Sequence, residues 1–172
     1  MANVKSFARH HDSFPTRNDL PAETRRKMVA MLDQQLADSF DLQSQLKQAH
    51  WNVKGPQFIA LHKLFDKLAE GLGETIDEIA ERATALGGVV HGTVRMAAQA
   101  SRLPDFPANA FAGEKVLKAL ADRYALLAAS SREAIDTAED AEDKTTADLF
   151  NQVSADVDKA LWFLEAHLED GK

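Results

Sequence analysis

Apolar residues recur every three or four positions along most of the chain, which is the spacing of an amphipathic helix. Period-two alternation, the mark of a half-buried strand, is missing throughout. Gly55-Pro56 and Gly87-Gly88 interrupt the pattern, because glycine and proline break helices. The sequence therefore predicts an all-α protein with four long helices. Their expected ranges are about 20–50, 58–86, 114–138 and 144–167, with Asp19 and Asp143 as candidate N-caps of the first and fourth.

The links between these helices differ in length. The first two helices and the last two are joined by short turns, whereas about 26 residues separate Gly87 from Gly113. A connection of that length can cross a bundle from end to end, and residues 93–99 within it are expected to form a short extra helix. The arrangement predicts a ferritin-like four-helix bundle over residues 20–169. Residues 1–19 lack apolar periodicity and are expected to form a flexible N-terminal arm.

Composition limits the chemistry that this bundle can perform. The 172 residues are 45% hydrophobic, enough for one domain with a substantial core. Twenty basic and 27 acidic residues give a net charge of −7, so the body should repel nucleic acid and any DNA contact must be local. The sequence has no cysteine, which excludes disulfides and thiolate metal sites. A metal would have to bind through histidine and carboxylate side chains.

Two features bear on location. The basic N-terminus is not followed by the apolar run of a secretory signal. No stretch approaches the roughly 18 uncharged apolar residues of a membrane span. A cytoplasmic protein is expected.

Imidazole and carboxylate groups gather on the second predicted helix, where six side chains recur at intervals of three or four residues. They are His62, Asp66, Glu70, Glu74, Asp77 and Glu81. At about 100° per residue they form one polar stripe roughly 120° wide. A solvated charged face is the plain interpretation of such a stripe. However, His50 ends the preceding helix across a short turn, which brings two imidazoles together near Asp66 and favours a site for a first-row metal.

A metal site inside one bundle is not predicted. Di-iron bundles use a Glu three residues before a His on one helix, but the residues three before His50, His62 and His167 are Lys, Ile and Leu. Asp66 and Asp77 are about 16 Å apart along a helix, whereas ligands of one metal lie within about 4–5 Å of each other. If both ends of the stripe bind one ion, the ends must come from two antiparallel chains, and two-fold symmetry then gives two sites per pair.

Several runs of residues carry a family resemblance. They are Gln48–Gly55, Phe58–His62, Asp66, Asp77 and Ala80–Ala83, with Ala121–Ala125 and Asp158–Phe163 further along. In residue type and spacing these runs resemble the signature of Dps, the DNA-binding protein from starved cells, which is a ferritin-like family. The similarity extends from about Thr16 to Leu168.

This resemblance implies a hollow twelve-subunit shell that oxidises ferrous iron, preferably with hydrogen peroxide, and stores ferric iron as mineral. Iron would then be both substrate and bound metal. Matched by position, one subunit would contribute His50, His62 and Asp66, and its two-fold mate Asp77 and Glu81. Trp51 occupies the family's position beside the iron, where an indole can supply an electron to a peroxide-derived oxidant. Its structural alternative is an aromatic plug between helices.

The junction between the third and fourth helices is strongly acidic. Residues 133–148 hold seven acids against one base, Lys144. The acids are Glu133, Asp136, Glu139, Asp140, Glu142, Asp143 and Asp148. A solvated turn rich in helix caps explains these acids as well as a cation pore between subunits would. In the Dps family this junction surrounds three-fold pores, where acids concentrate cations.

DNA binding is only weakly encoded. Residues 1–19 carry Lys5, Arg9 and Arg17 against two acids, a net charge of +1, whereas residues 20–172 carry 17 bases and 25 acids, or −8. Family members that condense DNA have arms richer in lysine. Twelve such arms acting together would nevertheless give non-specific DNA contact through multivalency.

Three functions remain in competition at this point. A ferroxidase and iron-storage shell accounts for both halves of the polar stripe. A nucleoid-associated DNA-binding protein with incidental iron binding would be favoured by a more basic arm. A plain helical scaffold leaves the histidines and the paired acids unexplained.

Overall fold

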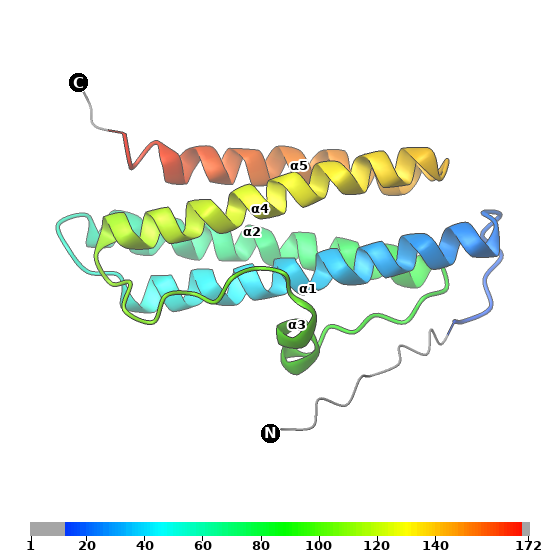
Figure 1. Cartoon of the computed structure of the whole chain (residues 1–172), viewed down its shortest axis with the longest axis horizontal. Helices are drawn as coiled ribbons and strands as arrows, with labels where there is room; N and C mark the ends of the chain where they lie inside the picture. The colour runs from blue at the N-terminus through cyan, green and yellow to red at the C-terminus, as the bar shows by residue number, and fades with distance from the viewer. Residues whose placement is uncertain (1–12, 170–172) are drawn as a thin grey trace.

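The computed structural model describes residues 13–169 and contains five helices in that range (Figure 1). The helices are α1 (Ala22–Asn52), α2 (Phe58–Ala85), α3 (Val94–Ala100), α4 (Gly113–Asp140) and α5 (Lys144–Glu165). The described residues contain no strand beyond one isolated bridge between Lys54 and Ala112. The predicted all-α bundle with a short extra helix in the long crossover is confirmed.

The bundle consists of two antiparallel hairpins, α1 with α2 and α4 with α5 (Figure 1). The α1–α2 turn lies beside the start of α4, where the Lys54 amide donates to the Phe111 carbonyl over 2.8 Å. The end of α2 lies beside the α4–α5 turn, where Arg82 contacts Asp143. The bundle therefore has two distinct ends, and α2 runs from one to the other over about 42 Å.

Large apolar side chains from all four long helices fill the core. Leu32, Phe65, Leu120 and Phe150 are fully buried. Tyr124 is also buried, and this burial raises the pKa of its phenol, so the group stays neutral. A groove of about 420 Å³ lies between α2 and α5, and Tyr124 of α4 contributes to its lining.

The helix ends correct two details of the sequence prediction. Asp143 caps α5 as expected, accepting a hydrogen bond from the Thr146 amide at 3.1 Å. Asp19 does not cap α1, because Pro21 occupies the N-cap position and no side chain bonds there. The fourth long helix ends at Glu165 rather than near His167, and residues 166–168 form a turn.

The chain preceding α1 rests against the end of α2. The Phe14 amide donates to the Gly87 carbonyl at 2.8 Å, and Gly87 has a φ of +84°. A Cβ at Gly87 would lie 2.7 Å from the Phe14 carbonyl oxygen, so glycine is needed both for the conformation and for the approach. Residues 1–12 of the predicted arm lie outside the described residues.

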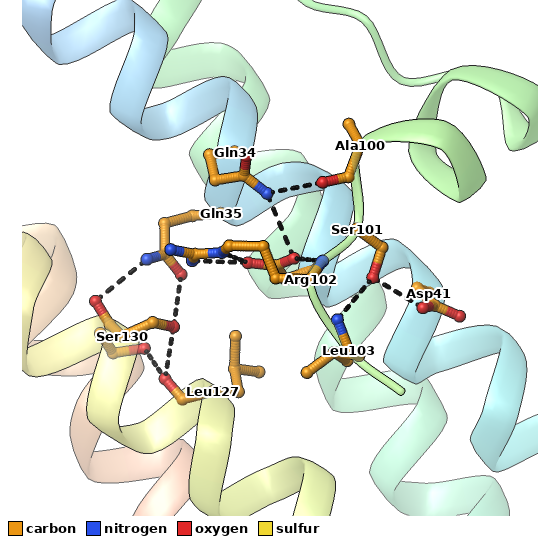
Figure 2. A network of polar contacts seen from close by, with 11 residues as sticks. Gln34, Gln35, Asp41, Ala100, Ser101, Arg102, Leu103, Leu127 and Ser130 are labelled. Carbon is orange, nitrogen blue, oxygen red and sulfur yellow. Dashed lines mark hydrogen bonds and ion pairs between the residues drawn. The ribbon is translucent and has the colours of Figure 1, made fainter. Parts of the chain in front are cut away.

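The crossover is fastened to α1 by side chains that the sequence analysis did not single out (Figure 2). Buried Asp38 accepts from the Arg102 amide at 2.7 Å and from its guanidinium at 2.6 and 2.9 Å. Gln34 donates to the Ala100 carbonyl at 2.9 Å, and Ser101 donates to Asp41 at 2.7 Å. We call this set of contacts the crossover clasp. It explains why α1 buries polar residues on one face.

Two further contacts continue the polar face of α1. Asp33 accepts hydrogen bonds from the amide and the Nδ1 of His91 at 2.8 and 2.9 Å, at the start of the crossover. Gln35 bonds Ser130 of α4 in both directions, so α1 is tied to the second hairpin as well (Figure 2).

Among residues 13–169, no helix is both long and apolar enough to cross a bilayer.

Candidate metal centre

His50 and His62 meet where α1 turns into α2, as the sequence predicts. Their rings stack with centroids 3.7 Å apart and planes inclined by 19°. The Nδ1 of His50 lies 2.7 Å from the carbonyl oxygen of His62, and the Nδ1 of His62 lies 2.9 Å from the carbonyl oxygen of His50. The pairing is reciprocal, so the turn between the helices fixes both rings at once.

These contacts also set the protonation of the rings. A carbonyl oxygen can only accept, so each neutral imidazole must carry its proton on Nδ1. The Nε2 of each ring then keeps the lone pair that a metal needs. Hydrogen bonding of the second ring nitrogen to a carbonyl is the arrangement found around histidine ligands of metals.

Asp66 lies one turn after His62 on α2, and its nearest cation is a lysine. The Nζ of Lys47 is 2.5 Å from Asp66 Oδ1, whereas the Nδ1 of His50 is 3.9 Å away. The hydrogen bond from Lys47 is the largest cause of the lowered pKa of Asp66, and it outweighs the opposing effect of desolvation. Asp66 is therefore ionised, and an incoming cation must share it with Lys47.

Asp77 and Glu81 lie near the other end of α2, and both are exposed. They are four residues apart, so they share one helix face. Within residues 13–169, no group of three or more His, Asp or Glu side chains is close enough to hold a metal ion in one chain. The histidine pair with Asp66 and the pair Asp77/Glu81 are thus two separate half-sites.

Trp51 is 62% exposed beside the histidine pair. It does not fill a space between helices of its own chain, so the aromatic-plug alternative is wrong for the single subunit. Phe58 and Ile59 are exposed on the same turn, at 40% and 59%. Exposed apolar side chains therefore lie near the histidine half-site in the chain, which is typical of a surface that another molecule covers.

One of the seven acids at the α4–α5 junction has a structural role. Asp143 is 2% exposed, caps α5 and binds Arg82. The other six are exposed: Glu133, Asp136, Glu139, Asp140, Glu142 and Asp148.

Of the candidate DNA contacts, Arg17 is exposed beside the start of α1. Lys5 and Arg9 lie outside the described residues.

Lys47 is the residue at this centre that the sequence analysis missed. Lys47 was noted in the sequence only because it lies three residues before His50, where an intra-bundle di-iron site would need Glu. Its position on the same face of α1 as His50, one turn earlier, is the signal that could have placed it near Asp66.

Comparison with known proteins identifies the class. A model of the ferritin-like domain matches residues 29–172. The chain is 43% identical over 155 residues to the DNA protection during starvation protein of Agrobacterium fabrum, covering 90% of this chain and 96% of that protein.

Solved structures agree with this assignment. DpsC from Streptomyces coelicolor superposes with a TM-score of 0.87 at 31% identity, covering 94% of both chains. An archaeal Dps homologue from Halobacterium salinarum gives a TM-score of 0.89 at 27% identity, covering 100% of this chain and 95% of that one. The protein belongs to the Dps family of ferritin-like proteins.

Proposed function

We propose that this Dps-family protein is a mini-ferritin that oxidises Fe(II), preferably with hydrogen peroxide, at sites shared by two subunits. The ferric product would be stored inside a shell of twelve subunits. The observation that carries the proposal is the division of the candidate ligands into two half-sites at opposite ends of α2. Each half is incomplete alone, and an antiparallel second copy would complete both.

The donor set suits iron. Carboxylates stabilise Fe(III) more than Fe(II) and so make the metal easier to oxidise, whereas neutral imidazoles still admit Fe(II). Two Fe(II) ions supply the two electrons that convert one hydrogen peroxide and two protons into two water molecules. A two-electron reduction of this kind releases no hydroxyl radical, and the chemistry is protective for that reason.

Individual residues would have distinct roles. His50, His62 and Asp66 of one subunit, with Asp77 and Glu81 of its mate, would bind the iron substrate. Trp51 is exposed at the edge of the histidine half-site, where it could donate an electron to an oxidant. The six exposed acids of the α4–α5 junction would raise the local concentration of Fe(II) where subunits meet.

Protection of DNA is the finer part of the proposal. A relative is named for DNA protection during starvation, and here iron chemistry would be the main means of protection. Direct and non-specific DNA contact through Lys5, Arg9 and Arg17 would be weak, because the arm carries a net charge of only +1. A cytoplasmic protein near the nucleoid fits both roles. The alternative remains a DNA-binding protein with incidental iron binding.

The stripe on α2 provides a matched test. Replacing Asp77 and Glu81 with Asn and Gln should abolish rapid peroxide-driven Fe(II) oxidation, and so should replacing both His50 and His62 with Ala. Glu70→Gln with Glu74→Gln removes the same charge from the same helix and should leave the rate within about twofold of wild type. If the two acid double variants lost the same fraction of the oxidation rate, the stripe would be only a solvated charged face, and this result would contradict the shared site.

A further inference from the structure

Arg82 directly follows Glu81 in the last turn of α2, and its side chain is held at three points. Its Nη2 donates to both carboxylate oxygens of Asp143, at 2.7 and 2.9 Å. Its Nε donates to the hydroxyl of Thr146 at 2.9 Å. Only 14% of the Arg82 side chain is exposed. The last turn of α2 is therefore bound to the junction of α4 and α5.

The acceptors of Arg82 are themselves fixed. Asp143 and Thr146 are almost completely buried, at 2% and 0% exposure. The Thr146 amide and hydroxyl both donate to the Asp143 carboxylate, which places that carboxylate at the N-terminus of α5. We call Arg82, Asp143 and Thr146 the junction knot. Its groups are hydrogen-bonded to one another, and a satisfied buried network of this kind is rigid.

The position of Glu81 depends on this rigidity. The Glu81 side chain is exposed, so the helix backbone is what sets its location. α2 ends at Ala85, only four residues later, and terminal helical turns open most readily. Arg82 adjoins Glu81 and is the side chain that secures this turn to the second hairpin.

We propose that Arg82 is a positioning residue for the iron site: through the junction knot it holds the last turn of α2 so that Glu81 stands where the partner's histidine half-site needs it. The inference rests on the proposed function. It also links the half-site with Glu81 to the acidic junction, because Asp143 belongs to both the knot and that junction. Lysine cannot replace Arg82, because a single ammonium lacks the planar fork that serves Asp143 and Thr146 together.

The test compares two arginines with similar partners. Arg82→Lys should raise the KM for Fe(II) about tenfold with kcat within about twofold, because a carboxylate ligand that is no longer held in place binds the metal more weakly. The matched control is Arg102→Lys, because Arg102 likewise bonds a buried aspartate, Asp38, through Nε and Nη2. The control should leave the KM unchanged. Hydrogen exchange of the amides of residues 81–85 should accelerate in Arg82→Lys alone.

A second variant keeps the test decisive if Arg82→Lys fails to assemble. Thr146→Val removes the hydroxyl that accepts from Arg82 and should shift the KM in the same direction. An unchanged KM in whichever variant assembles, or an equal shift in Arg102→Lys, overturns the inference. A wild-type shell that does not oxidise Fe(II) overturns the proposed function itself, and the positioning role with it.

Discussion

At the scale of single residues, neighbouring groups prepare the candidate ligands. The main-chain carbonyls of His62 and His50 keep the imidazole protons of His50 and His62, respectively, on Nδ1. Lys47 keeps Asp66 ionised. The meeting of the two histidines could be predicted, because a short turn joins the helices that carry them. The Lys47–Asp66 pair could not, because hydrophobic periodicity does not report how far a polar side chain reaches across a helix pair.

Lys47 should weaken cation binding to the histidine half-site. Lys47→Gln removes a positive charge 2.5 Å from Asp66, and Asp66 remains ionised at pH 7. Because the removed charge repels cations, a divalent cation should bind more tightly in the variant. Titration calorimetry with Co(II), carried out without hydrogen peroxide, measures this change in affinity.

The control for this variant is Lys118→Gln. Lys118 forms an ion pair of the same length with Glu114, on an exposed part of α4. Its replacement should leave Co(II) affinity unchanged. Weaker binding in Lys47→Gln would mean that Lys47 helps to build the site rather than competing with the metal.

At the scale of elements, the sequence predicted all five helices, and most of their boundaries differ by only a few residues. Apolar periodicity and the glycine pairs account for this success, since both are local signals. The polar face of α1 was not anticipated, because buried Asp38 and half-buried Asp41 accept hydrogen bonds from the crossover, which lies far along the chain. The crossover clasp and the junction knot pair residues 60 or more positions apart.

The junction knot should make the bundle acid-sensitive. Burial alone would raise the pKa of Asp143, but hydrogen bonds from Thr146 and Arg82 outweigh it and hold the pKa below its usual range. A carboxyl with a lowered pKa in the folded state stabilises the fold above about pH 4 and loses that contribution as the pH falls through the folded-state value. Asp143→Asn should therefore cost about 2 kcal/mol at pH 7 and progressively less below pH 4.

Thermal unfolding from pH 7 to pH 3 measures this difference. Asp158→Asn is the control, because its pair with Arg132 is about half exposed and should contribute less than about 1 kcal/mol. A gap between wild type and Asp143→Asn that stays constant with pH would show that the carboxylate charge is not what stabilises the junction.

The crossover clasp should open as a local unit. Asp38→Asn weakens the three hydrogen bonds that hold Arg102 and should cost about 2 kcal/mol. Hydrogen exchange should accelerate over residues 98–104 while α4 and α5 keep their protection. Acceleration spread evenly over all helices would contradict a local role for the clasp.

At the scale of the whole molecule, one chain carries two separate groups of candidate ligands and an uneven distribution of charge. The family and the bundle could be predicted from the sequence, because the motifs lie on helices with strong periodicity. The twelve-subunit shell is implied only by the resemblance, since contacts between copies leave no periodic signal. Native mass spectrometry should find about twelve times the 18.9 kDa chain.

DNA contact is expected to depend on the arm. Binding should be weak, independent of base sequence and steeply reduced by salt, because it rests on counterion release from phosphates. It should strengthen toward pH 6 as His10 and His11 gain charge. Electrophoretic shift assays with a protein beginning at Asp19 provide the comparison: the truncated shell should oxidise iron normally and lose the shift at every pH. An unchanged shift would place the DNA handle on the folded body.

The most direct test of the central claim is co-assembly of two inactive proteins. One carries His50→Ala and His62→Ala, and the other carries Asp77→Ala and Glu81→Ala. In a mixed pair, one of the two sites combines both intact halves and the other combines both damaged halves. Random mixing makes half of the pairs mixed, so peroxide-driven Fe(II) oxidation should recover to about a quarter of the wild-type rate. No recovery in shells that demonstrably contain both proteins would contradict an iron site shared between subunits.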